Sequence, residues 1–317
     1  MKKFIIFFTK IAILIVLTLA LLDVLYTVVY LQASNRGKID YVYNSHPRNY
    51  DVVILGSSRA NNHFVTHLFE DKGLKAFNYG MSGGHLFEAS LLLKLMIERK
   101  YKIENVIIET DLNLSNEKRA EGVAAKFLPY VHNSALIKEH FIHEEDFLEL
   151  FYIPFYRYIA FDAQIGFREI YFNLIHKKTS YLQNLGYAAL KGNNGKMKND
   201  LRALKPIQNK YYEEIKQICS ANNIKLIAVM TPMCSNTKGL DYFKKVSNIY
   251  PEIHNYENVV NEDQYFSSCG HMNDQGAQLF TSRIIKDFFT KPYRVPNSEL
   301  SLSQFKTLKG LNSERVN

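Results

Sequence analysis

One pattern limits the fold of this 317-residue chain more than any other: short apolar segments alternate with longer helical ones. Short, apolar and mostly β-branched segments bounded by turns predict buried strands. Such segments cover residues 51–55, 75–80, 103–110 and 224–230. The longer segments predict helices, at residues 58–73, 86–101 and 206–223. This order predicts an α/β domain whose parallel sheet is covered by helices on both faces.

Residues 115–205 interrupt that order. They carry many Phe and Tyr residues mixed with charges at helical spacing, so we expect a helical insertion in the α/β domain. Most aromatic side chains in such a segment belong to a core. A lid, a groove for an acyl chain and a surface lying against a bilayer are the alternatives.

The N-terminal segment predicts a membrane anchor. Residues 11–31 form an apolar run of about the length that crosses a hydrocarbon core of roughly 30 Å. The run is longer than the apolar region of a cleaved signal peptide and lacks the small residues of a cleavage site, so we expect it to be retained. Three lysines precede it and two basic residues follow it closely. This bias favours a cytoplasmic N-terminus and an extracytoplasmic remainder.

Asp23 is an unusual residue within the apolar run. A carboxyl group near the middle of a membrane costs about 2.5 to 3.5 kcal/mol on insertion scales. Two interpretations stay open: the side chain faces a helix of another membrane protein, or it remains protonated among apolar neighbours. The first would give the protein a partner in the membrane.

The chain thus divides into four predicted parts: an anchor at residues 1–34, a polar linker at 35–50, the α/β domain at 51–295 and a polar tail at 296–317. A net charge of +8 would suit a nucleic-acid partner. However, no zinc-finger, homeodomain or RNA-binding signature accompanies that charge, so we expect no nucleic acid. An anionic cell-envelope surface accounts for the same charge.

The three cysteines have no spacing that is typical of metal ligands. An oxidising compartment would allow one disulfide among Cys219, Cys234 and Cys269. At least one of the three is expected to be a small buried apolar residue. We therefore expect no metal.

The segment "DVVILGSSRA" places two serines directly after the first predicted strand. It lacks the lysine of a phosphate-binding P-loop and the spaced glycines of a dinucleotide site, so we expect no nucleotide cofactor. It also differs from the G-x-S-x-G elbow of α/β-hydrolases, because Ala60 takes the place of the last glycine and the serine comes too early in the chain. The simplest alternative is that Ser58 caps the next helix.

Polar or flexible residues follow the other strands as well. Gly83 comes after the second predicted strand, Asn113 after the third, and His271 precedes the last helix. The carboxyl ends of parallel strands meet at one edge of a sheet, so these residues are expected to lie near Ser58. A serine becomes a nucleophile when a base and oxyanion donors surround it. Taken singly, each is equally typical of an ordinary turn or surface.

In this order the residues resemble the site of the SGNH or GDSL superfamily of hydrolases and acyltransferases. Gly56, Ser57 and Ser58 resemble its first block, G-D-S, with Ser57 in the place of the aspartate. The segments "NYGMSGG", "VIIETDLN" and "SCGHMNDQGA" resemble the later blocks, although the third lacks the usual glycine and aspartate around the asparagine. The resemblance spans residues 51–290 outside the insertion and implies a three-layer, flavodoxin-like α/β/α sandwich.

The resemblance also implies roles for individual residues. Ser58 would be the nucleophile, His271 the base, and the Gly83 backbone N–H with Asn113 the oxyanion donors. The family aspartate three residues before the histidine is Ser268 here. In a serine protease, the loss of the corresponding carboxylate lowers the rate about 10⁴-fold.

Several outcomes of this departure stay open. Ser268 or a backbone carbonyl could orient the ring of His271. Alternatively, Asp263 or Asp274 could supply the carboxylate, or the site could be weak or inactive.

The resemblance implies a function at the cell envelope. We expect a membrane-anchored, extracytoplasmic serine esterase or O-acyltransferase that acts on a surface polysaccharide. Similar anchored proteins, such as the D-alanyl transfer protein of teichoic-acid modification and the alginate acetylation proteins, work with a membrane-bound acyltransferase. The rival hypothesis is a non-catalytic protein of the same fold that binds a glycan or scaffolds an acylation complex. Action on a lipid acyl chain is a third hypothesis, which depends on the aromatic insertion alone.

Overall fold

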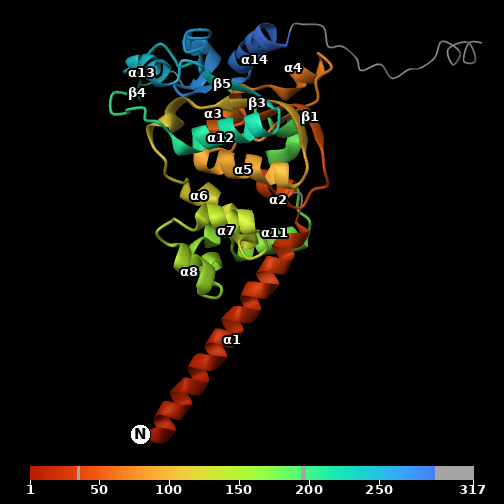
Figure 1. Cartoon of the computed structure of the whole chain (residues 1–317), viewed down its shortest axis with the longest axis vertical. Coiled ribbons are helices and arrows are strands. Elements are labelled where there is room, and N and C mark those ends of the chain that lie inside the picture. The colour runs from red at the N-terminus through yellow and green to blue at the C-terminus, as the bar shows by residue number, and fades with distance from the viewer. Residues whose placement is uncertain (34–35, 194–197, 290–317) are drawn as a thin grey trace, which may run out of the picture. The chain divides into compact units, whose positions relative to one another are not determined.

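The computed structural model describes residues 1–33, 36–193 and 198–289, so the predicted tail at 296–317 lies outside the described residues. A five-stranded sheet has the order β2-β1-β3-β5-β7, and all its neighbouring strands are parallel (Figure 1). Its strands are β1 (Asn49–Leu55), β2 (Ala76–Asn78), β3 (Lys102–Glu109), β5 (Lys225–Met230) and β7 (His254–Asn255). The predicted α/β class and parallel sheet are confirmed.

Helices cover both faces of this sheet. Alternate strand residues such as Val53 and Val106 join one core with the apolar sides of helices α5 (Leu86–Glu98), α12 (Lys210–Ala221) and α13 (Asp241–Ile249). Their neighbours Val52 and Ile107 are equally buried, so the opposite face is covered too. On that side lie α3 (Ser58–His63), α4 (Thr66–Glu70) and α14 (Asp274–Phe288), where the rings of Phe64 and Phe280 lie 5.2 Å apart. Strands buried on both faces explain the continuous apolar runs in the sequence.

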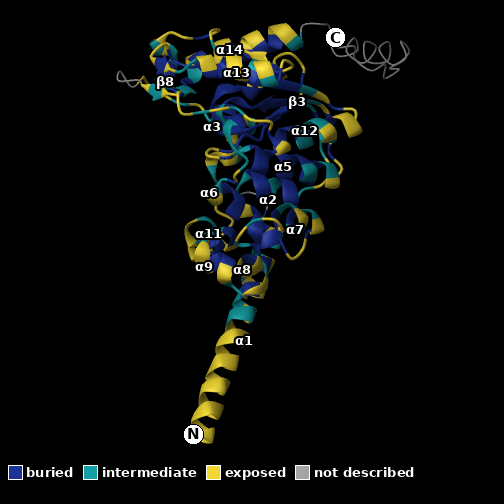
Figure 2. Cartoon of the chain, turned by 60° about the vertical axis from the view of Figure 1, so that its left-hand side comes forward, coloured by how far each residue is buried: buried dark blue, intermediate teal, exposed yellow. Residues whose placement is uncertain are grey.

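The N-terminal helix α1 (Lys2–Gln32) is long and apolar enough to span a membrane. It is exposed through residue 18 and partly covered beyond it (Figure 2). The segment expected as a linker, 35–50, contains helix α2 (Lys38–Tyr43), whose Ile39 and Val42 are buried in the same core as α5. This part of the chain therefore packs against the α/β domain.

Short helices make up most of the predicted insertion, and they contact α1 as well as each other. They are α6 (Glu121–Ala124), η2 (Ala125–Tyr130), α7 (Ala135–Phe141), α8 (Phe147–Tyr152), α9 (Tyr156–Ala160), α10 (Asp162–Ile165), α11 (Phe167–Leu174) and η3 (Ser180–Gly186); the turn η1 (Asp111–Ser115) leads into them from β3. Tyr130 and Tyr158 are fully buried, whereas Tyr152 and Phe167 are exposed. The aromatic residues thus divide between a core and an exposed surface.

Asp23 has partners within the chain. Its carboxylate accepts hydrogen bonds from the backbone N–H of Phe155 and from Nη2 of Arg157, both at 2.7 Å. Asp23 therefore pairs with the insertion of its own chain. The sequence had left open whether this side chain faces another membrane protein or stays protonated among apolar neighbours.

Small paired segments complete the structure: β4 (Asn199–Asp200) with β6 (Thr237–Lys238), and β8 (Phe266–Ser268) with β9 (His271–Met272); one further turn is η4 (Asp263–Tyr265). A disulfide joins Cys234, in the loop after β5, to Cys269, in the β8–β9 turn. Cys219 is buried with a free thiol. The chain forms one compact unit up to Ser282, and the described part of a second unit continues α14.

Candidate active site

The first strand delivers its serines through a turn that requires glycine. Gly56 has a φ of +134°, and a Cβ there would lie 2.9 Å from atoms of Ala60 and Glu109. Such a backbone conformation and such close contacts suit glycine alone. Ser57 is the N-cap of α3, and its Oγ accepts a hydrogen bond from the Arg59 N–H at 3.1 Å. Ser58 follows the cap, so its hydroxyl is available for another contact.

That contact is with His271. Ser58 Oγ lies 2.7 Å from His271 Nε2, and Ser268 Oγ lies 3.1 Å from Nδ1 on the other side of the ring. The two distances fit a ring in which Nε2 accepts the Ser58 proton and Nδ1–H donates to Ser268. Burial, assisted by the positive charge of Arg59, lowers the pKa of His271 below its usual value. The ring is therefore neutral near pH 7 and can act as a base.

The two aspartates considered as alternatives have other partners. Asp263 accepts hydrogen bonds from Ser235 and Asn236, and Asp274 accepts one from the Tyr187 hydroxyl at 2.7 Å. Across residues 1–33, 36–193 and 198–289, no carboxylate hydrogen-bonds with the His271 ring. Ser268 is the side chain that contacts Nδ1.

The predicted residues line one cavity of about 430 Å³. Ser58, His271, Gly83 and Asn113 all contribute to its wall, together with His85, Leu112, Lys198 and Asn199 among others. Gly83 has a φ of +77°, and its N–H has no hydrogen-bond partner within the described parts of the chain. A free backbone N–H and an amide beside a serine can stabilise an oxyanion.

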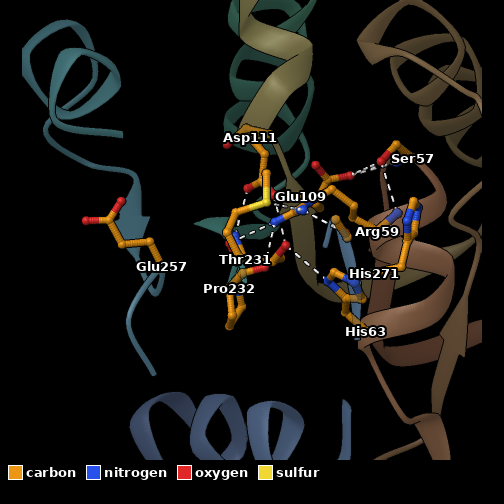
Figure 3. A network of polar contacts seen from close by, with 12 residues as sticks. Ser57, Arg59, His63, Glu109, Asp111, Thr231, Pro232, Glu257 and His271 are labelled. Atoms are coloured by element: carbon orange, nitrogen blue, oxygen red, sulfur yellow. Dashed lines mark hydrogen bonds and ion pairs between the residues drawn. The ribbon is translucent and has the colours of Figure 1, made fainter. Parts of the chain in front are cut away.

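A buried polar network, which the sequence did not reveal, surrounds Arg59 and reaches the loop that carries His271 (Figure 3). Arg59, 3% exposed, forms an ion pair with Asp111 at 2.5 Å. Its remaining N–H groups donate to the carbonyl oxygens of Gly270 at 2.7 Å, Thr231 at 2.8 Å and Pro232 at 3.0 Å, and to the sulfur of Met233. Since Gly270 precedes His271, the arginine fixes the histidine loop and is not free to bind an anionic substrate.

A second histidine belongs to the same network. His63 is fully buried; its Nδ1 lies 3.1 Å from Thr231 Oγ1, and its Nε2 accepts the Met272 N–H at 3.0 Å. The Thr231 hydroxyl in turn donates a hydrogen bond to Asp111 at 2.8 Å. Burial, with the charge of Arg59, holds the pKa of His63 well below its usual value. His63 is therefore neutral near pH 7, and its Nε2 supports the backbone next to His271.

Glu109 lies beneath the serine turn. Its Oε2 accepts the N–H of Ser57 at 2.9 Å and the hydroxyl of Ser57 at 2.6 Å, whereas Oε1 is buried without a hydrogen bond. Burial and the nearby Asp111 carboxylate raise the pKa of Glu109 to about 7. The sequence offered one signal for Glu109, a charged residue at the end of an apolar strand. We assigned it to the predicted strand at 103–110 and gave it no role in the site.

Comparisons with known proteins add little to this geometry. No protein-family model matches the chain, and no curated protein matches it. A solved structure of a protein from Streptococcus pneumonia, described provisionally as a platelet activating factor, is similar with 11% identity and a TM-score of 0.29 over 88% of this chain and 98% of that chain. Similarity at this level supports no statement about fold family or function. Among the described residues, no cluster of His, Cys, Asp and Glu could hold a metal ion.

Proposed function

We propose that the chain is a serine esterase or O-acyltransferase of the SGNH type, with a three-layer flavodoxin-like fold. The observation that carries the proposal is the 2.7 Å contact between Ser58 Oγ and His271 Nε2 in a cavity that Gly83 and Asn113 also line. A serine hydroxyl that is hydrogen-bonded to a neutral imidazole is an activated nucleophile.

The geometry supports a two-step acyl transfer. Ser58 Oγ attacks the carbonyl carbon of an ester while its proton moves to His271 Nε2, and the oxyanion faces the Gly83 N–H and the Asn113 amide. The tetrahedral species then expels the alcohol, which takes the proton from His271. Water or a sugar hydroxyl attacks the resulting acyl-serine, and His271 again receives and returns the proton.

The absence of a carboxylate at His271 Nδ1 limits the expected rate of the acyl transfer. A hydroxyl at Nδ1 fixes the ring through one hydrogen bond, but it carries no charge that stabilises the imidazolium. The positive charge of Arg59 also opposes that imidazolium. We therefore expect chemistry slower than that of an enzyme with a full triad.

The cell envelope is the proposed location. Helix α1 would span the cytoplasmic membrane with its lysines inside. The Cys234–Cys269 disulfide supports an extracytoplasmic domain, because such bonds persist in oxidising compartments. The proposed substrate is an ester on a surface polysaccharide, and a membrane-bound acyltransferase is the proposed partner. Asp23, which pairs with Arg157, gives no support to that partner.

One observation favours a second candidate function. Because Ser268 replaces a carboxylate at His271 Nδ1, the protein could have lost catalysis and kept the cavity. It would then bind a glycan or scaffold an acylation complex.

A serine-directed fluorophosphonate separates the two functions. The full chain in detergent is incubated with the reagent and analysed by intact mass and peptide mapping, beside Ser58→Ala and His271→Ala. A single adduct on Ser58 that disappears in both variants is expected for the enzyme. Ser267→Ala is the matched control, because Ser267 lies in β8, which pairs with the strand of His271, and its hydroxyl points to the Lys191 carbonyl; it should label like the wild type. A folded wild-type chain that forms no adduct would favour the binding role.

A further inference from the structure

The length of α1 limits how far the rest of the chain can stand from a membrane. A hydrocarbon core of about 30 Å takes up about 20 helical residues. The wholly exposed residues 4–18 of α1, which are apolar except at Thr9, Lys10 and Thr18, cover only about 22 Å at 1.5 Å per residue. The exposed part of the helix is therefore too short to fill the bilayer.

Both placements of the inner boundary lead to the same result. If Lys3 marks that boundary, about 20 residues bring the outer boundary to Asp23. If Lys10 marks it, the outer boundary moves to about Tyr30. Residues 19–30 are the part of α1 that the insertion partly covers. The insertion must then reach the outer boundary of the membrane.

Specific contacts fix the insertion at that level. Asp23 binds Arg157 and the Phe155 N–H, both at 2.7 Å, and Thr27 Oγ1 lies 2.8 Å from the Tyr158 hydroxyl. The ring of Tyr26 packs edge-on against those of Phe155 and Tyr158. Helix α9 is thus attached to α1 within one turn of Asp23.

The surface of the insertion is apolar where a soluble surface would be polar. In α11, Phe167, Tyr171 and Leu174 recur at helical spacing and are 51–70% exposed, whereas Ile170, next to them around the helix, is buried. Exposed side chains of the same kind on α8, α9 and their flanks are Leu148, Tyr152, Ile153, Tyr156 and Ile159. Figure 2 shows α8, α9 and α11 near the part of α1 that enters the globular region, and Figure 1 shows α11 directly beside it. Exposed apolar side chains gathered on neighbouring helices indicate an interaction site.

We infer that this surface is a membrane-contact collar, formed by α8, α9 and α11, that lies in the outer interfacial layer of the bilayer around α1. Three features select lipid as the occupant: α9 and α11 contact the apolar helix α1 directly, the collar contains several Tyr residues, which favour the headgroup level, and exposed basic residues flank it. Those basic residues, Arg168, Lys177 and Lys178, can bind lipid phosphates. The inference depends on the proposed membrane span but not on the chemistry of Ser58.

Single tryptophans test the collar, because the chain has none of its own. Tyr152→Trp reports on the collar, Val16→Trp on the span, and Val259→Trp on an exposed apolar position outside the insertion. Each full-length variant is reconstituted into phosphatidylcholine–phosphatidylglycerol vesicles, with or without lipids brominated high or low on their acyl chains. All three positions are exposed, so each variant should keep the thermal unfolding midpoint of the wild type.

The expected result is a graded loss of fluorescence. Val16→Trp should be quenched most strongly by lipids brominated low on the chain, Tyr152→Trp by lipids brominated near the glycerol, and Val259→Trp by neither. Quenching at Val16 with none at Tyr152 would overturn the collar while leaving the span intact, and the apolar surface would then belong to a protein partner. Absence of quenching at Val16 would overturn the span itself and, with it, the collar.

Discussion

Two buried arginines, one behind the candidate site and one between α1 and the insertion, show how differently this chain uses the same side chain. Arg59 and Arg157 each pair with one aspartate and are almost fully shielded from solvent. Arg59 has a partner for every N–H direction, including three backbone carbonyls around the histidine loop. Arg157 uses only Nη2, and its Nε and Nη1 have no hydrogen bond among the described residues.

The difference separates two kinds of task. A fully bonded guanidinium fixes the positions of several loops at once, which a reacting serine and histidine require. A guanidinium with unused donors joins two elements without fixing their surroundings. The candidate site is therefore expected to depend on its arginine more than the insertion depends on Arg157.

Matched substitutions test this comparison directly. Arg59→Met leaves Asp111 buried without its cation, and breaking a buried pair in this way costs about 3 to 5 kcal/mol of unfolding free energy. Arg157→Met should cost less, because the Asp23 side chain is 12% exposed to solvent whereas that of Asp111 is fully buried. Chemical unfolding of the full chain in detergent measures both.

A surface pair provides the control for these substitutions. Lys245 forms an exposed ion pair with Asp241, so Lys245→Met should change stability by about 0.5 kcal/mol or less. Equal losses for Arg59→Met and Arg157→Met would contradict the comparison. Arg59→Met should also abolish fluorophosphonate labelling at a temperature where the variant remains folded.

The disulfide offers a second way to compare the candidate site with the insertion, because both of its cysteines lie in loops at the candidate site. It closes a loop across 35 positions between Cys234 and Cys269, and such a loop contributes roughly 3 to 4 kcal/mol by the chain-entropy estimate. The double variant Cys234→Ser, Cys269→Ser should lose about that much and label more slowly at Ser58. Tyr152→Trp fluorescence in the same background should stay unchanged, because the insertion contains neither cysteine. A change there that matched the loss of labelling would show that the two regions are coupled.

The sequence predicted the parts of this fold that repeat a local pattern. The apolar runs between turns correctly predicted β1, β3 and β5. The rule that carboxyl ends of parallel strands meet at one edge predicted that four residues lie close together, and they line one cavity: Ser58, Gly83, Asn113 and His271. Strand β7 has two residues and a weak apolar signal, so its pattern did not distinguish it from a loop. The polar composition of 35–50 likewise concealed a helix whose apolar face is buried.

Contacts between distant residues could not be predicted in this way. The partner of Asp23 lies 134 positions away in the insertion, and Arg59 meets Asp111 after 52 positions. Neither pair follows a spacing rule, because each depends on how the sheet and the insertion fold back. The same reason left three interpretations open at His271 Nδ1 until the position of Ser268 was known.

The smallest expected effect concerns the proton at His271. Its pKa lies below the usual 6.5 because burial and Arg59 disfavour the charged ring, so the neutral base persists into mildly acidic solution. The rate of Ser58 labelling should therefore begin to fall only below about pH 6.5 as the pH decreases.

A carboxylate at Nδ1 would reverse this lowering of the pKa of His271. Ser268→Asp should move the fall in rate to higher pH and raise the labelling rate about tenfold or more at neutral pH. Ser268→Asn, which is similar in size and uncharged, should do neither. A wild-type rate that already fell above pH 6.5 would show that burial and the charge of Arg59 do not keep the ring neutral. Equal behaviour of Ser268→Asp and Ser268→Asn would show that a negative charge at Nδ1 does not control the strength of the base.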